Sequence, residues 1–301
     1  YPLRRQRQMC IRDRLILIGL ILLSAVVSAV VCSYKIKVAY YDETIEGLGT
    51  ECRVVLISDL HSRQYGVDNL RLISLIAEQN PEMIFMLGDM LSRNADETDI
   101  SEFAKLVFDL KYIAPVYYTI GNHENEFSAE LLKHVKSAVT AAGGVFLYNQ
   151  YKDIQIGENK VRLVAILGEK EPWLSYYSDS TKLPESYEPY KFLADLRNCE
   201  LPTLWLAHKP DMMICFDPYR EYRMDIVLSG HVHGGVWAIP CIGGIVSPAE
   251  GLFPHYDKGE YSFGSTRFIL SGGLTGYGWI PRIFNLPEIC VITLHQCSTT
   301  E

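Results

Sequence analysis

The segment "RVVLISDLH", residues 53–61, joins an unbroken apolar run to two polar side chains that can bind metal ions. An apolar run without polar alternation is typical of a strand that is buried on both faces of a largely parallel sheet. We expect this strand to end where Asp59 and His61 follow it. Because ligands gather at the carboxyl ends of strands in α/β sheets, the segment predicts both a fold class and the position of a site.

The chain on the carboxyl side of this segment alternates between apolar runs and amphipathic stretches. We expect strands at 83–88 and 115–121 and helices at 67–80, 101–113 and 128–144. Ser101 and Ser128 are the expected N-caps of the last two helices, and Gly143 is the expected end of the third. Strands that alternate with helices predict βαβ units and a largely parallel sheet.

Beyond residue 144 the expected strands follow one another more densely. They lie at 145–149, 152–157 and 161–167, and Gly157–Asn159 is expected to form a hairpin turn. This pattern predicts a second, mixed or antiparallel sheet packed against the first. Residues 173–189 are rich in Tyr, Ser and Pro and are expected to form a long loop, either a lid or substrate wall or an irregular surface excursion.

Five expected strand ends carry side chains of the kind that bind metals. After Asp59 and His61, the later ends carry Asp89, then Asn122 and His123, then His208, and finally His231 and His233. A single Asp or His after a strand is usually a turn residue or a cap. Five strand ends that all offer oxygen or imidazole nitrogen, and no thiolate, instead predict a site for divalent ions such as Zn, Mn or Fe.

His231 and His233 lie one residue apart in "SGHVHGG". On a regular strand such side chains share a face but stand about 6.5 Å apart, too far to hold one ion tightly. The flanking glycines favour a sharp bend or a close backbone approach. We therefore expect the two imidazoles to serve neighbouring but different targets.

The motifs D-x-H, G-D, G-N-H-E, a lone His and G-H-x-H occur here in the order that resembles the calcineurin-like metallophosphoesterase superfamily. The resemblance spans nearly all of residues 53–295, and "ISDLH", "GHVHGG" and "RIFNLPEICVITL" are most similar to its membrane-anchored or exported bacterial branch. It implies an α/β fold of two packed mixed β-sheets flanked by helices, with residues 51–301 as the catalytic domain. It also implies two divalent metal ions as cofactors.

The resemblance further implies a role for each motif residue. One ion would be held by Asp59, His61 and His233, the second by Asn122, His208 and His231, and Asp89 would bridge the two. His123 would be the catalytic proton donor to the leaving group, and Glu124 would orient His123 or a turn amide. Arg63, by contrast, is expected to be an exposed surface residue, with a phosphate clamp as the weaker alternative.

Residues 15–34 contain no charged side chain, and 20 residues of helix span about 30 Å, the thickness of a bilayer core. We expect an uncleaved transmembrane anchor, with a cleaved signal peptide as the alternative. Residues 1–14 form an N-terminal tail that resembles translated adapter sequence, and 35–50 are expected to be a linker. Arginines before the apolar segment predict a single-pass protein with an extracytoplasmic catalytic domain, although Lys35 and Lys37 favour the opposite orientation.

The formal charge is −8, and because the first 37 residues are basic, the remainder is more acidic still. An acidic body argues against nucleic acid as a partner. We expect a phosphoesterase that cleaves phosphodiester or pyrophosphate bonds with metal-activated hydroxide, on a substrate at a membrane or cell envelope. The alternatives are a phosphomonoesterase of the same fold and a non-catalytic metal-binding interaction protein.

Overall fold

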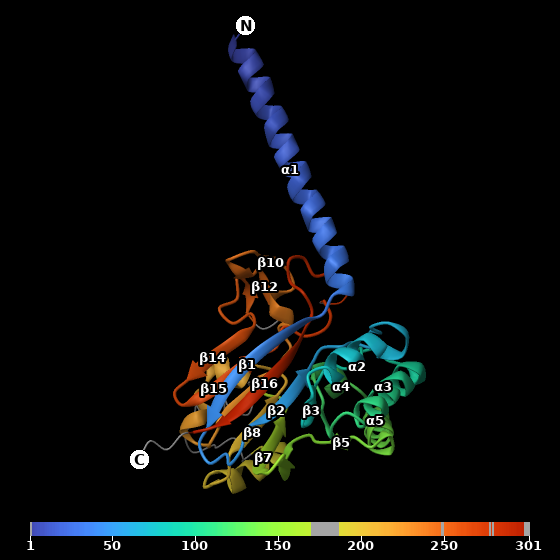
Figure 1. Ribbon diagram of the computed structural model, residues 1–301, viewed down its shortest axis with the longest axis vertical. Coiled ribbons are helices and arrows are strands. Elements are labelled where there is room, and N and C mark those ends of the chain that lie inside the picture. Colours follow the sequence, from blue (N-terminus) through green and yellow to red (C-terminus); the bar gives the residue numbers. More distant parts are fainter. Residues whose placement is uncertain (1, 170–186, 248–249, 277, 279, 298–301) are drawn as a thin grey trace.

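Two six-stranded sheets pack face to face, and helices cover their outer surfaces (Figure 1). The computed structural model describes residues 2–169, 187–247, 250–276, 278 and 280–297. The predicted α/β fold of two mixed sheets flanked by helices is confirmed. Most of the predicted loop at 173–189 lies outside the described residues.

The first sheet holds the strand that begins the predicted site. Its order is β1 (Lys37–Ile45), β16 (Glu288–Gln296), β2 (Cys52–Ile57), β3 (Met83–Leu87), β4 (Val116–Thr119) and β5 (Val145–Phe146). Strands β2 to β5 are parallel, as their βα connections predict, whereas β16 is antiparallel to β2. The carboxyl ends of β2, β3 and β4 therefore lie side by side at the same end of the sheet.

The second sheet is also mixed. Its order is β14 (Gly259–Phe263), β15 (Thr266–Leu270), β9 (Ile226–Ser229), β8 (Thr203–Ala207), β7 (Asn159–Ile166) and β6 (Gln150–Ile156). Strands β7, β8, β9 and β15 are parallel, whereas β6 and β14 are antiparallel to their neighbours. The predicted hairpin joins β6 to β7, with Gly157 in the left-handed region at φ +57°. Two short ribbons lie outside the sheets: β10 (Ala238–Ile239) with β11 (Gly243–Gly244), and β12 (Val246–Ser247) with β13 (Gly251–Leu252).

Three hydrophobic clusters explain why the strands are apolar on both faces. Val55 and Ile57 of β2 point into the cluster beneath the helices, while Val54 and Leu56 point into the cluster between the sheets. A third cluster lies on the outer face of the second sheet. Because successive strand residues alternate between faces, a strand buried on both sides needs an unbroken apolar run.

The first sheet is covered by α2 (Leu70–Ala77), α3 (Glu97–Leu110) and α5 (Ala129–Ala142), and the second by η3 (Glu188–Leu196) and α7 (Asp211–Cys215). Shorter helical turns are η1 (Val67–Asn69), α4 (Asn122–Asn125), η4 (Pro218–Arg220) and η5 (His233–Gly235). The prediction that Ser128 and Gly143 bound α5 is confirmed. The prediction that Ser101 caps α3 is wrong, because the Asp96 carboxylate accepts bonds from the backbone N–H groups of Thr98 and Asp99 and starts the helix one turn earlier.

The predicted linker at 35–50 is also wrong over much of its length, because it contains β1. This strand pairs in parallel with β16 at the edge of the first sheet. Ala39, Glu43 and Ile45 are buried, whereas most intervening residues face solvent. The polar residues that suggested a linker are the exposed half of an edge strand.

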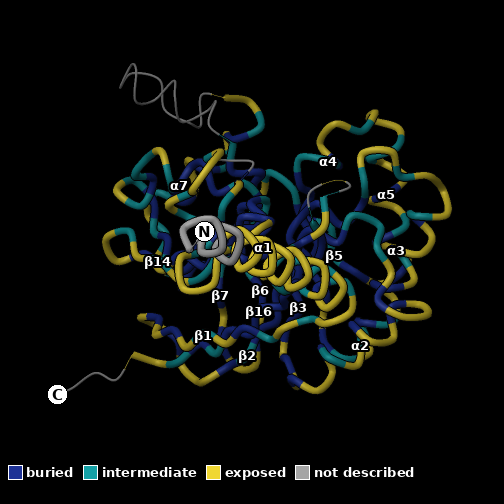
Figure 2. The backbone as a smooth tube through the Cα atoms, turned by 90° about the horizontal axis from the view of Figure 1, so that it is seen from above, coloured by how far each residue is buried: buried dark blue, intermediate teal, exposed yellow. Residues whose placement is uncertain are grey.

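The helix α1 (Pro2–Tyr34) projects from the body, and most of its apolar side chains between Ile11 and Tyr34 are exposed (Figures 1 and 2). The part from Ile11 to Tyr34 is long and apolar enough to cross a membrane, a test that a signal sequence would also pass. The helix includes the predicted tail as well as the predicted anchor. Its carboxyl end rests on the body, where Cys32 is buried.

Candidate metal centre

The predicted strand ends converge on one site between the two sheets. Three groups of side chains have potential ligand atoms within 4.8 Å of one another: Asp59, His61 and His233; His61, Asp89 and His123; and Asp89, His208 and His231. Asp89 and His61 each belong to two groups, so the groups are contiguous. The convergence that α/β topology predicts is therefore present.

Asp89 lies at the centre of this arrangement. Its Oδ2 atom is 3.4 Å from Nε2 of His208, 3.8 Å from Nε2 of His123 and 3.9 Å from Nε2 of His61. Its other oxygen, Oδ1, accepts a hydrogen bond of 2.9 Å from the backbone N–H of His123. One carboxylate oxygen is thus fixed by the backbone, and the other faces three imidazoles.

The backbone turns sharply at most of these residues. Asp59, His61, Asp89, His231 and His233 all have φ between +48° and +72°. Residues other than glycine rarely adopt this left-handed backbone conformation. Where they do, the surrounding structure holds them in it, and such residues cluster at functional sites. The turn after β9 also separates His231 from His233, which fall into different groups of ligands, as the spacing predicted.

Hydrogen bonds to carbonyls orient two of the imidazoles. Nδ1 of His208 is 2.9 Å from the carbonyl oxygen of Leu87, and Nδ1 of His233 is 3.1 Å from that of Thr275. A carbonyl only accepts, so each Nδ1 donates its proton. In a neutral imidazole the Nε2 lone pair is then left for a metal, an arrangement common among metal-binding histidines.

Three buried atoms test whether the site fits a metal. Nε2 of His61, Oδ1 of Asn122 and Nε2 of His208 have no hydrogen-bond partner among the described residues. Leaving buried polar atoms unpaired costs about 1–3 kcal/mol each unless something else satisfies them. Imidazole nitrogen and amide or carboxylate oxygen are suitable ligands for divalent zinc, manganese or iron. The donor set therefore fits divalent ions.

Burial controls the protonation of these groups. It lowers the pKa of His61 and of His231 to about 3, so both imidazoles are neutral at neutral pH. Burial raises the pKa of Asp59 to about 6. It acts in the same direction on Asp89, but the neighbouring imidazole of His208 outweighs it and lowers the pKa of Asp89. At neutral pH the site thus offers neutral imidazoles at His61 and His231 and an ionised central carboxylate, and the charge of Asp89 outweighs burial and raises the pKa of His208 to about 9.

Glu124 braces the strand ends from behind. Its buried carboxylate accepts hydrogen bonds from the backbone N–H groups of Asp89 (2.9 Å), Leu91 (2.9 Å) and Gly121 (2.8 Å). Burial, with the nearby charge of Asp89, raises the pKa of Glu124 to about 7. The predicted role of Glu124 in holding turn amides is confirmed, and it links the end of β3 to the end of β4.

His123 lies closer to the ligands than its predicted role requires. Its Nδ1 is 3.1 Å from Nδ1 of His61, and the two ring centroids are 4.4 Å apart. It also belongs to one of the three groups of potential ligands. Geometry alone thus allows either a metal ligand or a proton donor at this position.

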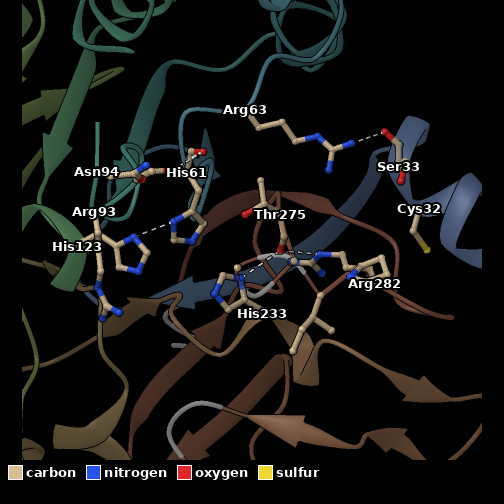
Figure 3. A pocket seen from close by; sticks show the side chains of 15 residues that line it. Cys32, Ser33, His61, Arg63, Arg93, Asn94, His123, His233, Thr275 and Arg282 are labelled. Carbon is tan, nitrogen blue, oxygen red and sulfur yellow. Dashed lines mark hydrogen bonds between the residues drawn. The ribbon is translucent and has the colours of Figure 1, made fainter. Parts of the chain in front are cut away.

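A pocket of about 640 Å³ opens in front of His61, His123 and His233 (Figure 3). Sequence reasoning missed Arg282, whose buried guanidinium donates through Nε to the carbonyl of Thr275 at 2.7 Å and also bonds the carbonyls of Gly272 and Gly273. It is distant in sequence from every ligand motif, although it is the first residue of "RIFNLPEICVITL", a segment that resembles the bacterial branch of the family.

The end of α1 also lines this pocket, through Cys32 and Ser33. Arg63 donates from Nη2 to the carbonyl oxygen of Ser33 at 2.7 Å (Figure 3). The expectation that Arg63 is an exposed surface residue is wrong, because this contact half-buries it at the pocket wall. Arg93 also lines the pocket, beside His123, and pairs with Glu126 at 2.8 Å (Figure 3).

The chain belongs to the calcineurin-like phosphoesterase family, whose model matches residues 52–235. It is therefore a metal-dependent phosphoester hydrolase. It is 26% identical to Phosphodiesterase YaeI of Escherichia coli, with 80% of this chain and 82% of that protein aligned. It is 28% identical to the metallophosphoesterase YkuE of Bacillus subtilis, over 80% and 78% of the two chains. It is 25% identical to UDP-2,3-diacylglucosamine pyrophosphatase LpxG of Chlamydia muridarum, over 80% and 82%.

Proposed function

We propose that the protein uses two divalent ions to hydrolyse a phosphodiester or pyrophosphate bond in a substrate at a membrane or cell envelope. The observation that supports this proposal is that two of the three groups of potential ligands share the carboxylate of Asp89, and that the third group is joined to them through His61. A carboxylate that serves two groups suits ions about 3.5–4 Å apart, the separation common in two-metal hydrolases. The relatives named phosphodiesterase and pyrophosphatase support this choice of bond.

In this proposal two sets of side chains hold one ion each. Asp59, His61 and His233 would hold the first, Asn122, His208 and His231 the second, and Asp89 would contact both. When bound, the ions would activate a water molecule and neutralise charge on the phosphoryl oxygens. The protein keeps its ligands aimed by fixing His208 and His233 through their Nδ1 atoms.

The contact between His61 and His123 supports a proton-donating role for His123. If Nε2 of the neutral His61 ring binds an ion, its proton lies on Nδ1 and is donated to Nδ1 of His123. A neutral His123 then carries its own proton on Nε2, on the side that faces Asp89 and the centre. His123 would transfer that proton to the leaving-group oxygen as its bond to phosphorus breaks.

A membrane location is supported by the position of α1. The helix is long and apolar enough to cross a membrane, and its last turn lines the same pocket as His61 and His123. A substrate at the surface of that membrane would need to travel only a short distance to the site. We propose a single-pass anchor with an extracytoplasmic catalytic domain, an orientation that rests on the sequence alone.

A phosphomonoesterase of the same fold is the second candidate, and one observation favours it. The strand-end motifs are poor in Arg and Lys, but Arg63, Arg93 and Arg282 line the pocket. Positive charge there suits a dianionic monoester or the two phosphates of a pyrophosphate. A non-catalytic metal-binding role is disfavoured, because every ligand position and His123 are filled.

Hydrolysis assays test the proposal. The full-length protein, purified in detergent with Mn²⁺ or Zn²⁺, is assayed on bis-p-nitrophenyl phosphate, on p-nitrophenyl phosphate and on a diphosphate diester. We expect turnover of the diester or the pyrophosphate bond to exceed turnover of the monoester. Preference for the monoester would favour the second candidate, and a folded, metal-loaded protein without activity on any substrate would contradict the enzymatic proposal.

A further inference from the structure

Large apolar side chains are exposed together on the ribbons β10–β13 and on the adjacent residue Phe284. We call this set the apolar lobe; it consists of Trp237, Ile239, Ile242, Val246, Leu252, Phe253 and Phe284. Ile242, Leu252 and Phe253 are 72%, 71% and 65% exposed. Between residues 236 and 254 the sequence contains one charged residue, Glu250, whose carboxylate accepts bonds from the backbone of His255 and Tyr256.

A chain of contacts ties the apolar lobe to α1. The indole Nε1 of Trp237 donates to the carbonyl of Pro281 at 3.0 Å, and the backbone N–H of Ala238 donates to that of Ile283 at 2.9 Å. The next residue, Phe284, donates its backbone N–H to Oγ of Ser28 in α1 at 2.6 Å. Ribbons β10 and β12 accordingly lie at the end of the body from which α1 projects (Figure 1).

These contacts determine which part of the body lies at the same level along the axis of α1 as the last turns of the helix. Ser28 precedes the end of the helix at Tyr34 by six residues, which is about 9 Å along the helix axis. The carbonyls of Ser33 and Tyr34 accept bonds from Arg63 and Arg71. The last turns of the apolar helix thus run alongside the body instead of above it. A bilayer that holds α1 must reach the part of the body beside Ser28.

We propose that the apolar lobe inserts into the interfacial region of the bilayer that α1 crosses. The inference rests on the proposed membrane insertion of α1. Exposed Trp, Phe, Leu and Ile side chains next to a spanning helix are suited to the boundary between head groups and acyl chains. Arg63 and Arg71 would then lie near the phosphates of the head groups. The pocket would open at head-group level, because Cys32 and Ser33 line it.

Spin labels on the full-length protein test this inference. Three variants each carry one nitroxide label, at Leu252→Cys, Leu22→Cys or Tyr112→Cys. In all three, Cys10, Cys215, Cys241 and Cys297 are replaced by Ser, and the protein is reconstituted in nanodiscs at one copy per disc. Tyr112 is the matched control. It is 74% exposed, but it lies between α3 and β4, at the amino ends of the parallel strands and so away from the metal centre at their carboxyl ends. Power saturation compares the access of oxygen, which concentrates in lipid, with that of a water-soluble nickel chelate.

We expect the Leu252 and Leu22 labels to favour oxygen and the Tyr112 label to favour the chelate. A water-exposed Leu252 label beside a lipid-exposed Leu22 label would overturn the inference while leaving the proposed anchor intact. A water-exposed Leu22 label would contradict the proposed anchor itself. A Leu252 label that becomes immobilised only in discs holding two copies would also overturn the inference and identify a second copy as the partner of the apolar lobe.

Discussion

The Nδ1 atoms of His61 and His123 lie 3.1 Å apart, so the ring expected to bind a metal and the ring expected to donate a proton are in direct contact. In such a pair one nitrogen must carry the proton and the other must accept it. The protonation of His123 is therefore linked to what His61 binds. This relationship connects metal binding to the proposed acid step.

Replacing His123 by Ala tests that step. We expect the metal content to be unchanged and the rate to fall about 10²–10⁴-fold for substrates with alkyl leaving groups. The loss should be much smaller for p-nitrophenyl substrates, because that leaving group needs little protonation. Kinetics with a series of leaving groups measures the difference.

His134→Ala is the matched control, because His134 is an exposed residue of α5 that pairs with Glu97 at 3.2 Å. It should leave the rate within twofold for every leaving group. Loss of metal from His123→Ala would show instead that His123 is a ligand, as its place among the grouped side chains allows.

Glu124→Gln tests the brace behind the strand ends. The carboxylate accepts three backbone N–H bonds, whereas an amide has one oxygen and would turn an NH₂ group toward at least one of those donors. We expect a loss of about 1–3 kcal/mol in the free energy of unfolding and weaker metal binding. Thermal unfolding and metal titration measure both, with the exposed Glu130→Gln as a neutral control.

Gly88→Ala tests the close packing at the end of β3. A Cβ atom there would come within 2.5 Å of Nδ1 of His208 and 2.6 Å of Cα of Gly121, and φ is +65°. We expect this variant to lose metal binding. A side chain on a left-handed backbone costs about 1–2 kcal/mol in the free energy of unfolding, and we expect the loss here to be larger.

Gly251→Ala separates the two effects. Gly251 has φ +80°, but no atom of the described residues lies within 4 Å of the position that a Cβ would take there. The substitution should cost only the backbone strain and leave metal binding intact. Equal losses from the two substitutions would mean that the packing of His208 against Gly88 does not matter.

Glu43 gives a pH dependence that is independent of the metal centre. It is buried on β1, with Oε2 3.5 Å from Nε of Arg267. Burial raises its pKa to about 7, with a smaller contribution from the charge of Glu260. The folded state therefore holds this proton over a range in which the unfolded state has lost it. The contribution of Glu43 to the free energy of unfolding must therefore fall as pH rises from about 4.5 to about 7.

Glu43→Gln should remove this pH dependence. We expect wild type to lose of order 1 kcal/mol more than the variant between pH 4.5 and pH 8, as measured by thermal unfolding of metal-free protein at both pH values. Glu130→Gln should behave like wild type. An identical pH response of wild type and Glu43→Gln would contradict the raised pKa.

The ligands could be predicted from the sequence because each follows an apolar strand directly. Asp59, Asp89 and His208 needed only the local pattern and the rule that strand ends converge. Ser33 reaches the pocket through a long-range contact with Arg63 that no local motif encodes, and Arg282 lies far along the chain from every ligand motif. The strand β1 was mistaken for a linker because an edge strand needs apolar residues on one face only.

Cap and loop details depended on competition between neighbouring groups. Ser101 is an acceptable N-cap, but Asp96 forms a capping box with Asp99 and begins α3 earlier. The contact of α1 with the pocket could not be predicted either, because an apolar helix gives no signal of what its end will touch. The ligands could thus be predicted from short segments of sequence, whereas the residues around them are brought together by tertiary packing.

The metal stoichiometry of wild type and Asp89→Asn tests the central claim most directly. We expect wild type, measured by elemental analysis after dialysis against Mn²⁺ or Zn²⁺, to hold two ions per chain and to reach full activity at the second equivalent. Asp89→Asn should lose both ions and the activity, because the carboxylate of Asp89 is proposed to contact both ions. A fully active wild-type protein with a single ion, or an Asp89→Asn variant that retains two, would contradict the account.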